Sequence, residues 1–149
     1  MESNELRESL REAERGKAST WIDYPPTPRW WAPMFGVWAA VFTANEGYVG
    51  GLPGALVTLV LAAFMGGVIG WQRRVRGTFP TGRPPRELNA SLLGLFAGAA
   101  VIALVAWLVA VQVAVWAAVV VAGLGSWALV AWYERVYARV SDRVRDRLR

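Results

Sequence analysis

Glu46 is the only acidic side chain between Pro33 and Arg86, and it directly follows Asn45. An ionisable residue within a membrane segment is a functional candidate, because an uncompensated charge is costly in hydrocarbon. Gln112 is the only strongly polar residue near the middle of a later apolar stretch. We therefore predict that Asn45, Glu46 and Gln112 border an outer vestibule. The alternative is that Glu46 is a polar loop residue at the membrane interface, because a glycine-rich turn follows it.

Five arginines gather in one loop, residues 73–87, where they could contact the phosphate groups of anionic lipids. They are Arg73, Arg74, Arg76, Arg83 and Arg86. Membrane topology alone also explains them, because cytoplasmic loops carry an excess of basic residues. For the same reason we do not expect nucleic acid as a partner. The partners we predict are membrane lipids and other membrane-embedded chains.

The residue inventory excludes several kinds of chemistry. The sequence contains no cysteine and no histidine. This removes disulfides, thiolate and imidazole metal ligands, and catalysis by Ser–His or Cys–His pairs. The sequence also lacks a Gly-rich phosphate loop, a nucleophile elbow and a catalytic pair of carboxylates. We therefore predict that the protein is not an enzyme and uses no cofactor or metal.

The elements that must position these residues are membrane helices. The chain has 149 residues, and 55% of them are hydrophobic. Between Pro33 and Tyr133 its charges are confined to Glu46 and the 73–87 loop. A soluble domain would instead give each helix a wet face. We predict an all-α, polytopic membrane fold with four transmembrane helices, at about residues 33–50, 54–72, 88–110 and 113–133.

The last two predicted spans share one uninterrupted apolar stretch, residues 88–133. A single helix of that length would measure about 70 Å, more than twice the ~30 Å thickness of a hydrocarbon core. The stretch must therefore fold back. Trp107 and Trp116 flank Gln112 as interfacial aromatic residues do. We place the turn at residues 110–113, although no Gly or Pro marks it.

The basic residues predict the direction of the spans. All 16 Lys and Arg lie in the N-terminal segment, the 73–87 loop or the C-terminal tail. The positive-inside rule then places both termini in the cytoplasm, with the chain crossing the inner (plasma) membrane several times. We divide the chain into a cytoplasmic N-terminal segment (1–32), a membrane domain (33–133) and a basic cytoplasmic tail (134–149).

The two terminal segments have distinct patterns. Residues 2–15 alternate Glu and Arg around a thin apolar stripe, which predicts an amphipathic helix, and a Pro- and Trp-rich interfacial segment follows. The tail is expected to continue the last span as a helix. Three interpretations of the tail remain open: it lies on anionic headgroups, it pairs with the acidic N-terminal helix, or it is a solvated extension.

Small residues recur every fourth position on all four spans, a spacing that lets helix backbones approach closely. The positions are Gly36 and Ala40, Gly66 and Gly70, Gly94 and Gly98, and Ala118 and Ala122. Four such faces exceed what one bundle strictly needs, which predicts a homo-oligomer. The alternative is composition, because an Ala- and Gly-rich bacterial chain from a GC-rich genome produces such spacings by chance.

The spans also read as two hairpins of the same orientation. Each is entered through a Pro- and Arg-containing segment and left through a Trp–Arg–Val exit, centred on Trp71 and Trp132. A parallel duplication would relate the hairpins by an axis along the membrane normal. The alternative is that any helix leaving a membrane shows Trp followed by Arg.

These features together predict a non-catalytic integral membrane subunit that acts as a scaffold, an assembly factor or an accessory chain of a membrane complex. The alternative function is a homo-oligomeric channel or small transporter with Glu46 near its outer mouth.

Overall fold

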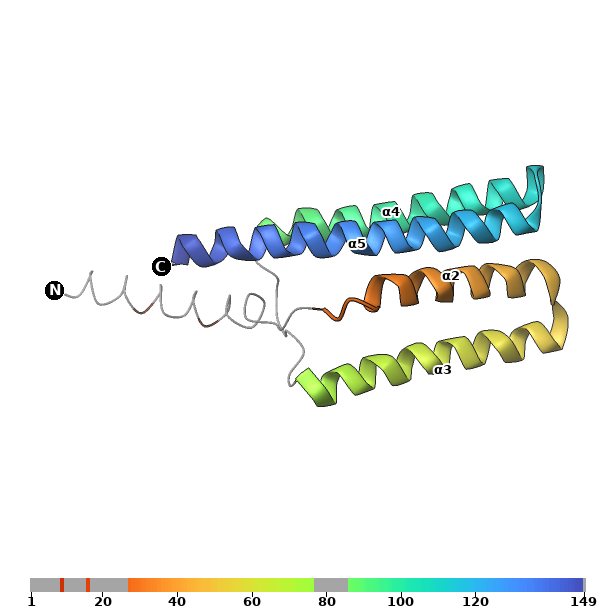
Figure 1. The fold of residues 1–149 in the computed structure, drawn as a ribbon, viewed down its shortest axis with the longest axis horizontal. Helices are drawn as coiled ribbons and strands as arrows, with labels where there is room; N and C mark the ends of the chain where they lie inside the picture. The colour runs from red at the N-terminus through yellow and green to blue at the C-terminus, as the bar shows by residue number, and fades with distance from the viewer. Residues whose placement is uncertain (1–8, 10–15, 17–26, 77–85, 149) are drawn as a thin grey trace.

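The fold consists of four α-helices in the computed structural model, which describes residues 9, 16, 27–76 and 86–148 (Figure 1). The helices are α2 (Trp31–Tyr48), α3 (Gly51–Arg76), α4 (Arg86–Gln112) and α5 (Val115–Leu148). The predicted all-α class is confirmed. The predicted N-terminal helix and the centre of the 73–87 loop lie outside the described residues.

Three of the four helices are long and apolar enough to cross a membrane: Gly51–Val75, Leu88–Gln112 and Val115–Arg147. The prediction of a polytopic membrane protein is confirmed to that extent. α2 is long enough but not among the three, because it is less apolar: its last turns carry Thr43, Asn45 and Glu46. Its length still amounts to about 27 Å, close to the thickness of a hydrocarbon core.

Each hairpin closes with a tight turn, and the two turns lie at the same end of the molecule (Figure 1). Between α2 and α3 the chain passes through Gly50 and Gly51, whose φ angles are +58° and +57°. These left-handed values favour glycine, since a Cβ atom there would crowd the backbone. The other turn, at Val113 and Ala114, needs no glycine, because neither residue has a positive φ angle; the Val109 carbonyl accepts hydrogen bonds from both of their amides, at 2.9 and 3.1 Å.

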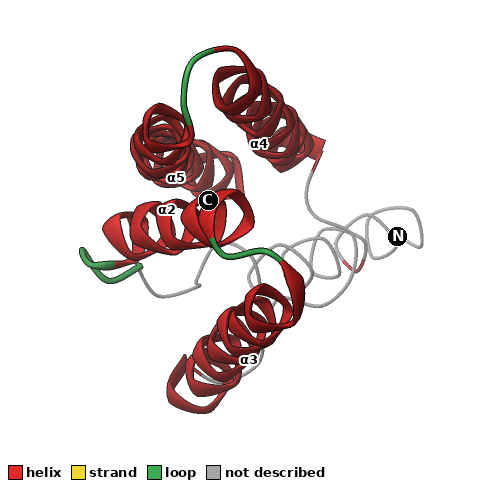
Figure 2. Ribbon diagram, turned by 90° about the vertical axis from the view of Figure 1, so that its right-hand side faces the viewer, coloured by secondary structure: helices red, strands yellow, loops and turns green. Residues whose placement is uncertain are grey.

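The helices pack in a row in the order α3, α2, α5, α4, which the end-on view in Figure 2 shows. The most extensive interface joins α2 to α5, across the two hairpins, and α4 packs almost as extensively on α5. A twofold duplication would pair α3 with α4 as it pairs α2 with α5. The described parts of α3 and α4 form no comparable interface, so the packing is not symmetric.

Two glycines bring the backbones of α2 and α5 together. A Cβ atom added at Gly36 would lie 2.8 Å from the carbonyl oxygen of Gly123 and 2.9 Å from the Cβ of Trp127. A Cβ atom at Gly123 would lie 3.1 Å from the Cβ of Ala40. Real Cβ atoms essentially never lie as close to other heavy atoms as at Gly36, so this position needs glycine, whereas a side chain at Gly123 would require Ala40 to shift by a few tenths of an ångström.

The α4–α5 hairpin uses glycine differently, as a seat for a large side chain on the facing helix. Gly94 lies under the ring of Trp132. A Cβ atom added at Gly94 would lie 3.0 Å from the nearest ring atom, Cη2. Gly98 faces Leu129 in the same way, and Gly125 on α5 faces Ile102 on α4. Large-into-small packing of this kind supplies the van der Waals contact that holds membrane helices together.

α3 stands apart from this close packing. Most of its apolar side chains are exposed, including Leu59 and Val60, which are 65% and 67% exposed. Away from the turn, large side chains contact α3: Trp30, just before α2, packs against Trp71 with ring centroids 5.9 Å apart, and the Trp38 indole donates a 3.2 Å hydrogen bond to the Leu61 carbonyl. Bulky residues between the two axes keep these backbones separated.

The glycine contacts predict that a Gly→Ala substitution changes the stability of the fold differently on α2 and on α3. Gly36→Ala should destabilise the fold by about 1–3 kcal/mol, because its methyl group overlaps α5. Gly66→Ala should be neutral or stabilising by up to about 1 kcal/mol, because alanine favours helix and no other described atom lies within 4 Å of its Cβ position. Chemical denaturation in detergent, followed by circular dichroism, measures both. Equal changes in the unfolding free energy of the two variants would contradict the packing of Gly36 and Gly66.

Candidate functional site

Asn45 is the centre of the polar cluster at the turn end of the bundle. It lies one turn before the end of α2, and only 4% of its surface is exposed. Its side-chain Nδ2 donates to the carbonyl oxygen of Gly54 at 3.0 Å and to the hydroxyl oxygen of Thr58 at 3.0 Å, both on α3. The side chain therefore ties the two helices of the first hairpin together.

Glu46 completes the cluster from the exposed side. Its Oε1 accepts a 2.9 Å hydrogen bond from the Thr58 hydroxyl and lies 3.3 Å from the Asn45 Nδ2. One carboxylate oxygen thus collects two donors from two helices. Hydrogen bonds to a charged acceptor are stronger than those between neutral groups, so the carboxylate holds the cluster more firmly than a neutral residue would.

One atom of the cluster has no protein partner. The amide oxygen Oδ1 of Asn45 is buried and accepts no hydrogen bond from the described residues. The reverse orientation of the amide would place this oxygen against the carbonyl of Gly54, which can only accept, so the orientation with Nδ2 toward Gly54 is the one that chemistry requires. That orientation leaves the buried amide oxygen without a hydrogen bond, which costs free energy.

Gln112, the third predicted vestibule residue, lies outside this cluster. It is the last residue of α4, and its side chain is exposed at the same end of the molecule. The structure brings Asn45 and Glu46 together with Thr58 and Gly54. The last two were not predicted as partners, although Thr58 is the only hydroxyl residue between Gly51 and Arg76.

Four of the five predicted lipid-contacting arginines lie at the opposite end of the bundle. Arg73 and Arg74 are exposed on the last turns of α3. Arg76 ends α3 and Arg86 begins α4, and Arg83 lies outside the described residues.

The predicted small-residue faces have different environments. Gly36 and Ala40 face α5, Gly94 and Gly98 face α5 from α4, and Ala118 and Ala122 are 0% and 5% exposed. Gly66 and Gly70 have no other described atom within 4 Å of their Cβ positions. The uncovered pair therefore lies on α3 alone.

A shallow groove that sequence reasoning missed runs between α2 and α5. Its volume is about 420 Å³, and apolar residues line it, among them Pro33, Val37, Val120, Leu124 and Trp127. The spacing of Pro33, Val37 and Ala40 along one face of α2 was a signal in the sequence, but only the partner helix makes a groove of that face.

The polar cluster and the groove thus offer different capabilities. The cluster is a hydrogen-bonded latch between α2 and α3, and Glu46 leaves its second carboxylate oxygen without a protein hydrogen bond in the described structure. Such a carboxylate attracts cations to the turn end but provides no second acid or base for catalysis. The groove offers only apolar contact.

Comparison with known proteins gives no relative for this chain: no family model, no curated protein and no solved structure matches it.

The latch predicts that Asn45→Ala destabilises the fold by about 1–2 kcal/mol, because three acceptors lose the amide donor. Gln112→Ala, an exposed amide at the same end, should change the unfolding free energy by less than about 0.5 kcal/mol. Denaturant unfolding in a single detergent compares the two. The latch would be refuted if both substitutions had the same small effect.

Proposed function

We propose that the chain is a non-catalytic integral membrane subunit, a scaffold or accessory chain that associates with further membrane helices through α3. The observation that carries this proposal is the contrast between α3 and the other helices. α2, α4 and α5 bury small residues against one another, whereas α3 leaves Gly66, Gly67 and Gly70 uncovered. A small-residue face is the surface by which membrane helices approach each other.

Packing energetics favour contact between the uncovered glycine face of α3 and another protein helix. Lipid chains are as apolar as leucine, so exposed Leu and Val side chains cost nothing in a bilayer. A flat glycine face, by contrast, packs more closely against another helix than against mobile acyl chains. α3 therefore has a surface suited to a second protein helix, from another copy of the chain or from a different subunit.

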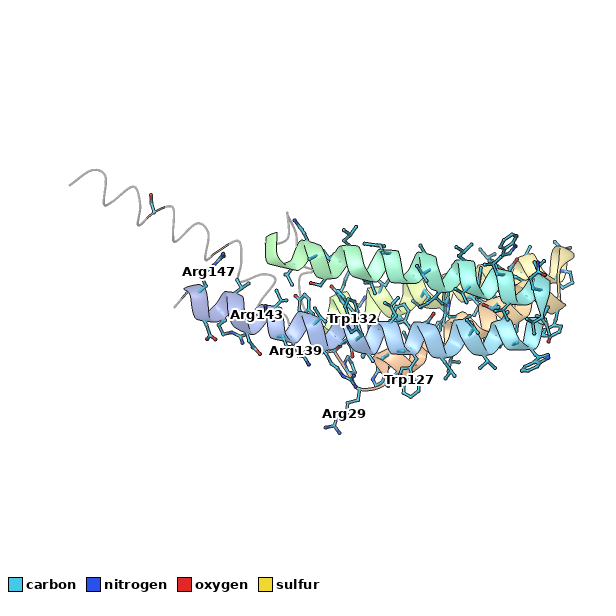
Figure 3. All side chains as sticks on the ribbon, turned by 90° about the horizontal axis from the view of Figure 1, so that it is seen from above. Arg29, Trp127, Trp132, Arg139, Arg143 and Arg147 are labelled. Carbon is cyan, nitrogen blue, oxygen red and sulfur yellow. The ribbon has the colours of Figure 1, made fainter. Side chains whose placement is uncertain are left out.

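In the proposed topology all four helices cross the inner membrane, and both termini are cytoplasmic. Two observations support it: the two turns share one end of the molecule, and neither turn carries Lys or Arg. The opposite end carries exposed Arg73 and Arg74 on α3 and exposed Arg139 and Arg143 on α5 (Figure 3). The positive-inside rule places that end in the cytoplasm.

A second candidate, a homo-oligomeric channel, rests on the Glu46 cluster. Around a symmetry axis, the carboxylates of several copies would form a ring that attracts cations at the outer mouth. Proteoliposome flux measurements separate this candidate from a purely structural subunit. Ion flux that changes its cation selectivity in Glu46→Gln would favour the channel, whereas the subunit proposal expects no flux.

The association surface predicts a position-specific effect. Gly66→Leu, alone or with Gly70→Leu, should reduce cross-linking or co-purification of partner chains from native membranes at least several-fold. Ala97→Leu places the same side chain on an exposed small position of α4 and should have no effect. Cross-linking in native membranes followed by mass spectrometry identifies the partners. Unchanged recovery in both Gly variants would refute the α3 surface.

The topology is testable because the chain has no cysteine of its own. Single cysteines at Leu52 and Val113 should react with a membrane-impermeant maleimide added to the outer face of the inner membrane. Cysteines at Thr27 and Asp142 should react only after the membrane is permeabilised. A Thr27→Cys variant labelled from outside would show that α2 does not cross the bilayer, and an Asp142→Cys variant labelled from outside would overturn the cytoplasmic C-terminus.

A further inference from the structure

The groove between α2 and α5 lies within the apolar part of the bundle. Its lining residues on α5, from Val119 to Trp127, belong to a segment apolar enough to cross a membrane. The close approach at Gly36 and Gly123 forms its floor, and Val37, Leu124 and Trp127 stand at its edges, each between 49% and 65% exposed. The groove is therefore open to the surrounding lipid along its length.

Arg29 directly precedes α2, four residues before Pro33, which lines the groove at that end. The backbone is already turned there, because the amide of Trp31 donates to the carbonyl of Pro28 at 2.9 Å and Trp30 has αR dihedral angles. This turn holds Arg29 at the Pro33 end of α2. Figure 3 shows Arg29 and Trp127 projecting from the same side of the molecule.

The charge at this end is positive and available. Arg29 is exposed and makes no ion pair with a described residue. Across the groove, α5 leaves the apolar region with Glu134 and then Arg135, of which the arginine is the exposed one. An apolar groove with a cation and a tryptophan at one end is chemically complementary to a phospholipid. The acyl chain would lie in the groove, and the phosphate would lie at the cationic end.

From this placement we propose that the α2–α5 groove is a binding site for an anionic phospholipid, with one acyl chain along Gly36 and Val120 and the headgroup phosphate at Arg29. Bulk lipid would fill any apolar groove without preference for its headgroup. Headgroup preference is what Arg29 adds. The site differs from the arginines of the 73–87 loop and does not depend on the proposed role of α3.

The test uses a fluorophore attached to a single introduced cysteine and quenching by brominated lipids in nanodiscs. Val120→Cys reports on the groove, and Leu56→Cys is its matched control, because both lie five residues into helices that begin at the turn end. The control position faces lipid on α3, and 56% of its residue surface is exposed. The probes are brominated phosphatidylglycerol and brominated phosphatidylcholine with identical chains.

Phosphatidylglycerol should quench the Val120 label about five-fold more effectively at low mole fraction than phosphatidylcholine, the preference that one interfacial arginine supplies. The Leu56 label should show no preference. Arg29→Gln should abolish the preference at Val120. Arg74→Gln removes the same charge from the same end of the bundle but away from the groove, and it should leave the preference intact.

Three results would overturn the proposal. The first is equal quenching by both lipids at Val120, which means bulk lipid only. The second is a preference that survives Arg29→Gln or disappears equally in Arg74→Gln, which means attraction by overall charge. The third is protection of the Val120 label from both lipids while the Leu56 label is quenched, which means that a protein surface covers the groove.

Discussion

The close approach of α2 and α5 at Gly36 and Gly123 sets the arrangement of the whole chain. These two helices belong to different hairpins, so their contact is what makes one bundle out of two independent units. In lipid there is no hydrophobic drive to bring helices together, and packing must supply the free energy. Glycine allows such packing, because without a side chain the backbone atoms of the two helices can come into van der Waals contact. The same approach leaves a shallow depression along one side, so the groove is a direct consequence of this backbone contact.

The first hairpin is held by a different kind of interaction. Large aromatic side chains keep α3 at a distance from α2, and directional contacts connect them: the Asn45 latch near the turn and the Trp38 indole at mid-helix. Polar contacts in hydrocarbon are specific but individually modest, since the separated state also finds partners. The hydrogen bonds therefore fix the register of α3 against α2, but the packing between the two helices is weak. A helix held in this way can form close contacts on its free side without disrupting the rest of the bundle.

The sequence predicted the elements well but not the partners of each helix. Charge segregation and the length of the 88–133 stretch were sufficient to predict an all-helical membrane fold and a fold-back, which the structure places at Val113 and Ala114. The turn lacked a glycine signal because neither Val113 nor Ala114 has the positive φ angle that favours glycine. In the polar site, Asn45 and Glu46 were identified as unusual residues, but their partner Thr58 was not. A hydroxyl on a different helix becomes a partner only through register, which depends on the two-glycine turn and on the aromatic spacing between α2 and α3.

Small-residue spacing illustrates the same limit in physical terms. All four spans carry the pattern, yet Gly36 meets backbone, Gly94 and Gly98 meet large side chains, and Gly66 and Gly70 meet no other described residue. A sequence pattern specifies how closely a helix can be approached but not what approaches it. The occupant depends on the competition between lipid and protein at each face. A depression bounded by exposed Leu, Val and Trp side chains accommodates a flexible acyl chain, whereas a glycine face suits a rigid helix. The groove between α2 and α5 is a surface of the first kind, and the uncovered glycines of α3 form a surface of the second kind.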